Sequence, residues 1–267
     1  MSEMMDVLNN FKELPAMPNV IMRALTVIKN PESGAKELGN IISYDQALST
    51  KVLTLVNSSY YGFAQQISSI PRAISLIGML KAKNIIMTVA MRPMLTSMGG
   101  KILWEHAIKT AVGCELIAKR IKTVDPDDAF MAGFLHDIGK IILRSYDQKL
   151  YDRAESLGKE KGADIIEVER SFFKVDHCII GSQLAQRWQL PILINNVIKY
   201  HHRPSLSSFV LPCLLVNVVD YLVRDNFDEN DKGNSFNTII SSKFGDPKML
   251  RDNIFSKANI LLAELSR

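Results

Sequence analysis

The stretch AFMAGFLHDIGKIIL, residues 129–143, decides the fold because it sets a histidine and an acid inside an otherwise apolar helical pattern. A second acid, Asp220, interrupts the apolar run LPCLLVNVVDYLV at 211–223. Burying an unpaired carboxylate is costly, so each acid needs a cation, a metal ion or a dense set of donors as its partner. Apart from Lys140, one turn after Asp137, we expect no basic partner beside them. The two acids therefore indicate a binding site inside the fold.

Histidines supply the missing partner. His136 and Asp137 are adjacent, about 100° apart around a helix, so both side chains can point towards one centre. His201 and His202 extend an apolar helical stripe into the interior by the same geometry. A single histidine on such a face is usually an ordinary core or surface residue, but here all five share one pattern with the two acids. Helical bundles build metal centres from the side chains of several helices. We therefore predict a transition-metal site near His136 and Asp137, drawing on the histidines of the chain: His106, His136, His177, His201 and His202.

Helical periodicity dominates the chain. Apolar residues recur at spacings of three and four, which predicts helices rather than strands. Pro18, Asp45 and the DPDD run at 125–128 are typical of helix starts. We expect DPDD to cap one helix that continues to about residue 143. The few β-branched runs have no partner strand, so the fold class is predicted to be all-α.

Two interruptions divide the chain: SMGG at 97–100 and the polar segment RDNFDENDKGNSFN at 224–237. We expect a helical N-terminal subdomain over residues 1–98. It should pack on a second helical bundle over residues 99–223, which carries the histidines. Residues 224–267 should form a polar loop followed by a helical tail.

Composition excludes several classes of protein. The net charge of +4 is spread along the chain without a run of basic residues, which argues against nucleic-acid binding. The N-terminus has no apolar signal core, and no apolar stretch approaches the roughly 20 residues that span a bilayer. Cys114, Cys178 and Cys213 form no CxxC pair and lie in apolar surroundings, as free thiols in a reducing compartment do. We expect a cytoplasmic protein that binds no membrane.

Several motifs together resemble the HDOD family of bacterial signalling proteins. HDIGK at 136–140, with His106 before it and Asp220 after it, resembles the H…HD…D pattern of the HD phosphohydrolase superfamily. His177 and the pair His201–His202 resemble the additions found in the two-metal HD-GYP phosphodiesterases. The remaining matches point to HDOD and cover roughly residues 8–222: LPAMPNVIMRALTVI at 14–28, IISYDQALSTKVLTLVNSSYYGF at 41–63, SSIPRAISLIG at 68–78 and WQLP at 188–191.

The resemblance implies a set of metal ligands within an HD-like bundle. One ion would be held by His106, His136, Asp137 and Asp220. A second would share Asp137 and add His177, His201 and His202. Mixed imidazole and carboxylate ligands suit one or two ions of Fe, Mn, Zn, Ni or Co.

The same resemblance gives possible roles to Lys140 and Glu169. In an active member, Asp137 would serve the catalytic metal centre and Lys140 would neutralise a phosphate oxygen; the alternative for Lys140 is a solvated lysine at a helix end. We interpret Glu169, eight residues before His177, as a surface acid in preference to a hydrogen-bond acceptor behind the site.

Two functions remain open. The first is a regulatory module that binds a partner protein and uses the metal structurally. HDOD proteins are regarded as non-enzymatic, which favours this interpretation. The second is a metal-dependent phosphohydrolase with a nucleotide, cyclic nucleotide or other phosphate ligand, which the complete ligand set favours. The residues after His202 are RPSLSS, without the GYP motif, so cyclic di-GMP is not the expected substrate.

Overall fold

The computed structural model describes residues 15–30, 32–228 and 235–266, and every secondary-structure element in these ranges is helical. The prediction of an all-α fold is confirmed. The elements, in chain order, are α2 (Asn19–Lys29), α3 (Ala35–Ser43), α4 (Gln46–Val56), α5 (Ile70–Ile77), α6 (Met79–Ile121), α7 (Pro126–Leu135), α8 (Ile138–Tyr146), α9 (Gln148–Lys161), α10 (Ile165–Phe173), α11 (His177–Arg187), α12 (Ile192–Tyr200), the 3₁₀ turn η1 (Pro204–Leu206), α13 (Val210–Val223), α14 (Ser235–Phe244) and α15 (Pro247–Ser266).

The helix starts expected from the sequence are present. Asp45 caps α4 by accepting a hydrogen bond from the backbone N–H of Leu48. Asp125 caps α7 by accepting from the N–H groups of Asp127 and Asp128. These side chains satisfy donors that have no partner within the helix, which explains why the helices begin where they do.

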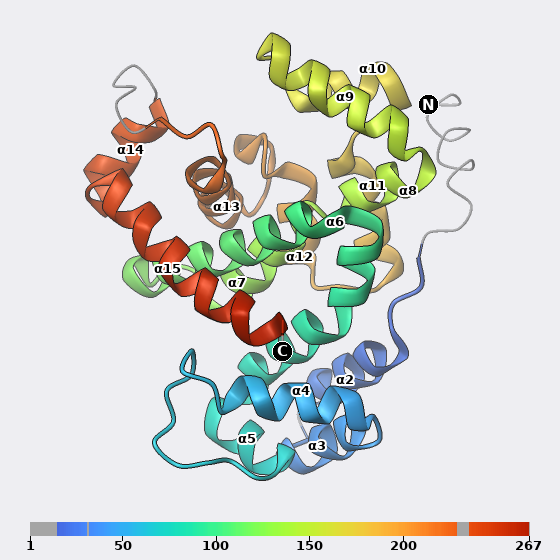
Figure 1. Cartoon of the computed structure of the whole chain (residues 1–267), viewed down its shortest axis with the longest axis vertical. Coiled ribbons are helices and arrows are strands. Elements are labelled where there is room, and N and C mark those ends of the chain that lie inside the picture. Colours follow the sequence, from blue (N-terminus) through green and yellow to red (C-terminus); the bar gives the residue numbers. More distant parts are fainter. Residues whose placement is uncertain (1–14, 31, 229–234, 267) are drawn as a thin grey trace.

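Helix α6 is the longest element and connects the two ends of the molecule (Figure 1). The interruption expected at 97–100 is confirmed at Gly100, whose φ of 75° and ψ of 174° break the helical geometry and kink α6. A positive φ suits glycine because it has no Cβ. The N-terminal part of α6 packs against α2, α4 and α5, and the helix as a whole also contacts α7, α8, α13 and α15.

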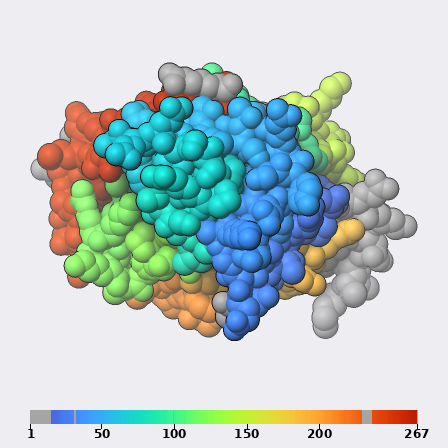
Figure 2. Space-filling model, turned by 90° about the horizontal axis from the view of Figure 1, so that it is seen from below, coloured from blue at the N-terminus to red at the C-terminus, as the bar shows by residue number. Residues whose placement is uncertain are grey.

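The helices are arranged around α6 in Figure 1. Helices α2 to α5 form one end of the molecule, and α8 to α11 lie towards the other. From below, the N-terminal helices make a continuous blue-to-teal surface over their end (Figure 2). The division of the chain at residues 98 and 223 remains a prediction. The C-terminal α15 packs on α6, α13 and α4, and residues 229–234 of the predicted polar loop lie outside the described ranges.

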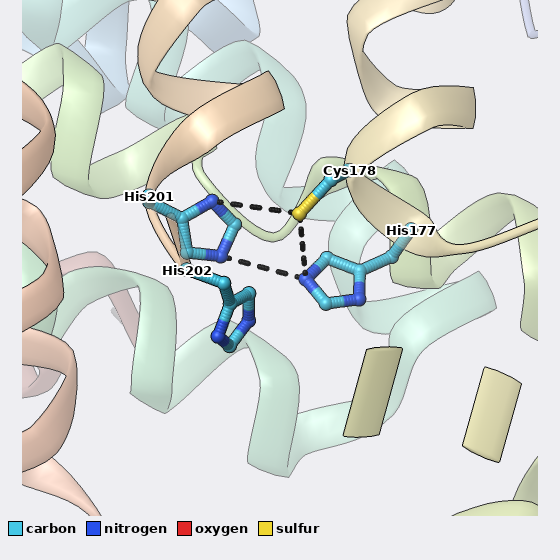
Figure 3. A group of neighbouring side chains, drawn as sticks. All are labelled: His177, Cys178, His201 and His202. Carbon is cyan, nitrogen blue, oxygen red and sulfur yellow. Dashed lines mark hydrogen bonds between the residues drawn. The ribbon is translucent and has the colours of Figure 1, made fainter. Parts of the chain in front are cut away.

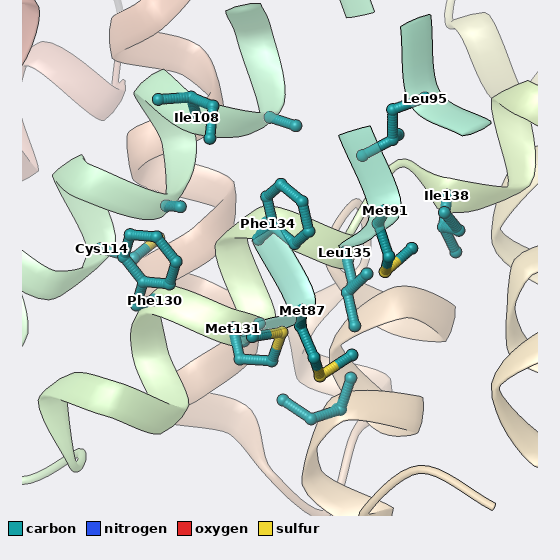
Figure 4. Packing of buried hydrophobic residues seen from close by; sticks show 14 of the residues in the cluster. Met87, Met91, Leu95, Ile108, Cys114, Phe130, Met131, Phe134, Leu135 and Ile138 are labelled. Atoms are coloured by element: carbon teal, nitrogen blue, oxygen red, sulfur yellow. The ribbon is translucent and has the colours of Figure 1, made fainter. Parts of the chain in front are cut away.

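Part of the apolar core lies between α6 and α7 (Figure 4). Met87 and Met91 of α6 are buried, as are Phe134 and Leu135 of α7 and Ile138 of α8. Phe134, Leu135 and Ile138 flank the dipeptide His136–Asp137, so packing of the core fixes its backbone. None of the helices in the described part of the chain combines the length and apolar character needed to cross a lipid bilayer.

Candidate metal centre

The chain breaks its helix at the HD dipeptide. Helix α7 ends at Leu135 and α8 begins at Ile138, with Asp137 at φ −97° and ψ 12°. The expectation of one helix continuing to residue 143 is therefore wrong. The apolar pattern runs through the break because both helices bury their residues here. The turn directs His136 and Asp137 into the same interior space, which adjacent positions on one helix would do less well.

Two glycines allow α11 to lie close to this turn. A Cβ added at Gly139 would lie 1.9 Å from the carbonyl oxygen of His177. A Cβ at Gly181 would lie 3.0 Å from the backbone nitrogen of Gly139. The glycine of HDIGK therefore permits α8 and α11 to cross in close contact. This crossing places His177, the first residue of α11, against Asp137.

A first group of side chains surrounds one oxygen of Asp137. Nε2 of His106 on α6 and Nε2 of His136 lie 3.5 and 3.3 Å from Asp137 Oδ2. The two imidazole nitrogens are 3.3 Å apart. Asp220 on α13 stands beside them, its Oδ1 at 3.1 Å from His106 Nε2 and 3.8 Å from His136 Nε2.

A second group faces the other oxygen of Asp137. Nε2 of His177 and Nε2 of His201 lie 3.3 and 3.7 Å from Asp137 Oδ1. These two nitrogens are 3.4 Å apart. His202 and Cys178 complete the group, in which each residue offers one ligand atom and all of these atoms lie within 4.8 Å of one another (Figure 3). The structure thus brings together all seven residues predicted from the sequence and adds Cys178.

Hydrogen bonds behind the rings set which nitrogen faces the centre. Nδ1 of His136 donates to the carbonyl oxygen of Gly133 at 2.7 Å. Nδ1 of His201 lies 3.1 Å from the carbonyl oxygen of Ile198, which can only accept. Since Nδ1 holds the proton in each neutral ring, Nε2 presents a lone pair to the centre.

Glu169 is the acceptor that orients the ring of His177. The prediction that Glu169 lies on the surface is wrong. Its side chain is fully buried, with Oε2 2.7 Å from Nδ1 and 2.8 Å from the backbone N–H of His177. An acid that accepts from the outer nitrogen of a histidine fixes the ring's tautomer and raises its basicity as a ligand. The sequence signal was weak because Glu169 lies on α10, where neighbouring Glu167 and Arg170 are exposed.

Two acceptor atoms in the centre therefore lack a hydrogen-bond donor. Asp137 Oδ1 and His202 Nε2 are buried and have no hydrogen-bond partner among the described residues. A cation between the groups would satisfy these atoms. Two N or O ligands at 2.0–2.1 Å from a tetrahedral ion are about 3.3–3.4 Å apart, and about 3.0 Å apart in an octahedral site. The observed separations of 3.1 to 3.8 Å are close to these values. The residues fit divalent metal ions.

Charge in the centre is consistent with that fit. Burial alone would raise the pKa of Asp137, but His136 and Lys140 outweigh it and hold this pKa well below its ordinary range. Arg224 and the neighbouring His106 and His136 also hold the pKa of Asp220 low against the effect of burial. Burial would lower the pKa of His136, but the two carboxylates raise it to about 9. Without a metal ion, a proton is thus the positive charge that the acids recruit.

Two basic side chains stand where the centre approaches solvent. Lys140 Nζ lies 2.5 Å from Asp137 Oδ2, and its side chain is 22% exposed. The alternative of a solvated lysine does not hold, because this ammonium is paired with a buried acid. Arg224, four residues after Asp220 on α13, pairs with that acid and is 42% exposed. The expectation that Asp220 has no basic partner is wrong, and the i,i+4 spacing was the available signal.

Known proteins resemble this chain in sequence and in fold. The sequence profile of the HDOD domain family matches residues 14–204. An HDOD domain protein of unknown function from Geobacter sulfurreducens is 26% identical, with a TM-score of 0.74 over 94% of this chain and 92% of that one. A protein of Shewanella amazonensis SB2B described as a candidate phosphohydrolase is 23% identical, with a TM-score of 0.75 over 97% of each chain. The second likeness shows the shared fold.

One curated relative is longer than this chain and matches it over only part of its own length. An uncharacterised protein of Treponema pallidum (strain Nichols) is 27% identical over 228 residues, which are 80% of this chain and 44% of that protein. The chain therefore spans less than half the length of this relative.

Proposed function

The chain belongs to the HDOD family, and from that premise we propose that it is a bacterial regulatory module that binds two divalent transition-metal ions and acts by binding a partner protein. The carrying observation is the set of buried acceptors around Asp137, one of whose oxygens has no hydrogen-bond partner among the described residues. A regulatory role is favoured by family membership and by the absence of a GYP motif after His202.

The proposed ligand set follows the two oxygens of Asp137. His106, His136, Asp137 and Asp220 hold the first ion, and the second is held by Asp137, His177, His201 and His202. Ligands that come from α6, the α7–α8 turn, α11, the residues directly after α12, and α13 make such ions part of the core. The free energy of metal binding is then part of the free energy of folding.

The same centre supports regulation through α6. His106 lies on α6, and the N-terminal part of this helix packs on α2, α4 and α5. An ion that fixes His106 fixes the part of α6 that follows Gly100, and this part joins the N-terminal part of the helix at the kink. A partner protein that contacts those helices would be sensitive to the presence of metal.

A second candidate function is a metal-dependent phosphohydrolase, and the two partly exposed basic side chains beside the centre favour it. When bound, divalent ions supply Lewis-acid chemistry for attack on a phosphate ester. Lys140 and Arg224 are partly exposed and reach the same acids that line the centre. Their positive charges would orient and neutralise the phosphate group of a nucleotide or cyclic nucleotide.

Elemental analysis of protein purified without chelator tests the proposal. We expect at least one equivalent of a transition metal per chain. Removal of metal by a chelator should lower the melting temperature by roughly 10 °C, since a ligand at a thousandfold excess over its Kd contributes about 4 kcal/mol to stability. Metal-free protein with an unchanged melt would refute the metal centre.

A substrate screen on metal-loaded protein separates the two functions. The regulatory proposal expects no turnover of phosphomonoesters, phosphodiesters or cyclic di-GMP. Turnover that Lys140→Met abolishes, while the metal content stays unchanged, would establish the phosphohydrolase instead.

A further inference from the structure

Cys178 lies inside the second group and is not one of the seven predicted residues. It follows His177 on α11 and is buried, with 5% of its surface exposed. Its Sγ is 3.5 Å from His177 Nε2 and 3.9 Å from His201 Nδ1. Figure 3 shows the sulfur between the two imidazole rings, with His202 on their other side.

The other cysteines of the chain have different surroundings. Cys114 and Cys213 are also free and buried. Neither belongs to a group of converging ligand atoms in the described part of the chain. Cys213 Sγ lies 3.6 Å from a backbone carbonyl oxygen, that of Asn196. Burial of a thiol in the core is therefore common to all three cysteines, whereas contact with the histidines is particular to Cys178.

An independent observation points to a ligand at this place. Asp137 is only 3% exposed, and its Oδ1, which has no hydrogen-bond partner among the described residues, lies 3.3 Å from His177 Nε2. The unpartnered Nε2 of His202 belongs to the same group. The thiol thus belongs to a group in which a cation would satisfy two unpartnered acceptors.

The distance between sulfur and nitrogen matches shared coordination. Zn–S bonds are about 2.3 Å and Zn–N bonds about 2.0–2.1 Å long, so two such ligands at an angle of about 90–120° lie about 3.1–3.8 Å apart. Cys178 Sγ and His177 Nε2 are 3.5 Å apart.

We propose that Cys178 binds the second ion as a thiolate, an inference that rests on the proposed metal centre. On binding, the S–H bond breaks, its proton leaves to solvent and a sulfur–metal bond forms. The two positions then differ in chemical class. The first, with two carboxylates, suits a harder ion such as Mn²⁺ or Fe²⁺. The second combines thiolate and imidazole and selects a softer ion, with Zn²⁺ preferred over Mn²⁺.

X-ray absorption at the zinc edge tests the assignment on the full chain loaded with two equivalents of Zn²⁺. The wild type should show a sulfur shell near about 2.3 Å beside the nitrogen and oxygen shell. Cys178→Ala should lose this shell and bind its second zinc at least about tenfold more weakly. Cys213→Ala, the matched control, should keep both. Cobalt-loaded wild type should show a thiolate-to-cobalt charge-transfer band that Cys178→Ala lacks.

The outcomes separate this inference from the proposed function. Zinc bound by nitrogen and oxygen alone in the wild type overturns the role of Cys178 and leaves the metal centre standing. A sulfur shell that survives in Cys178→Ala also overturns it. Failure of the wild type to bind any zinc overturns the metal centre itself. If Cys178→Ala does not fold, the wild-type spectrum and Cys178→Ser decide the question.

Discussion

Asp137 and Glu115 are both buried acids, but they differ in the donors that their carboxylate oxygens have. Glu115 on α6 is 5% exposed, and its Oε1 accepts from Lys81 Nζ and Lys119 Nζ, each at 2.7 Å. Its Oε2 accepts from the hydroxyl of Tyr60 at 3.4 Å. Each oxygen of Glu115 therefore has a donor.

Asp137 is as deeply buried, but one of its two oxygens has no donor among the described residues. Lys140 pairs with Oδ2, while Oδ1 faces the Nε2 atoms of His177 and His201 without accepting a hydrogen bond. The difference teaches how to tell the two kinds of polar cluster apart. A structural ion pair arrives with its own donors, whereas a metal site presents lone pairs that only a cation can satisfy.

Replacement of the shared acid should have the largest effect. Asp137→Asn keeps the shape of the side chain but removes the charge that both ions share. We expect affinity for both ions to fall by more than about 100-fold, and the metal-dependent rise in melting temperature to disappear. Thermal melts with and without Zn²⁺ measure this.

Glu115→Gln is the contrasting variant, because it removes the other buried acid. It should keep the full metal-dependent rise in melting temperature. If Asp137→Asn keeps that rise as well, the distinction between the two acids fails.

Glu169→Gln should affect one ion and spare the other. Loss of the carboxylate behind His177 removes the acceptor that orients this ring. Affinity for the second ion should fall by about 10–100-fold, while the first ion is unaffected. Calorimetric titration with Zn²⁺ resolves the two events. Glu167→Gln, on the exposed face of the same helix, should match the wild type; equal weakening of both ions by Glu169→Gln would contradict the division into two groups.

Lys140→Met should destabilise metal-free protein more than metal-loaded protein. Without ions, the Lys140 ammonium neutralises Asp137, and its loss should cost about 1–3 kcal/mol of unfolding free energy. With ions bound, the metal neutralises this acid and the cost should nearly vanish. Chemical denaturation in both states measures the difference. Lys149→Met is the exposed control, and an equal cost in the two states would contradict the account.

Glu115 should give the smallest effect, visible as a dependence on pH. Burial would raise the pKa of Glu115, but Lys81 and Lys119 outweigh it and lower this pKa below 4.5. A lowered pKa in the folded state means that its contribution to stability is present above pH 4.5 and is lost as pH falls through the folded pKa.

The difference in stability between wild type and Glu115→Gln should therefore shrink as pH falls below about 4.5. Denaturation across this range in the presence of chelator measures it, with the exposed Glu160→Gln as control. A constant difference across the range would show that the ion pair carries no such contribution.

The same comparison shows which features of a buried acid can be predicted from the sequence alone. The rule that an acid within an apolar run needs a partner pointed correctly to Asp137 and Asp220. Glu115 in AVGCELIAKR satisfies the same criterion, yet its partners are lysines, one of them 34 residues away. Local sequence cannot distinguish the two outcomes, because the partner is chosen by packing between helices.

The helical pattern and the caps were predictable because they depend on neighbouring residues. Asp45 and Asp125 cap helices as expected, and Gly100 interrupts α6. The break at His136–Asp137 was not predictable, since the buried pattern continues through it. The place of Glu169 behind His177 was also missed, because it depends on how α10 meets α11.

Anomalous diffraction from crystals loaded with Zn²⁺ tests the central claim most directly. The account predicts two zinc peaks, one beside each oxygen of Asp137, about 3.5–4 Å apart. The first peak should lie between His106 and His136, and the second between His177 and His201. Crystals that show no zinc peak at Asp137, at saturating zinc and with both groups of side chains ordered, would contradict it.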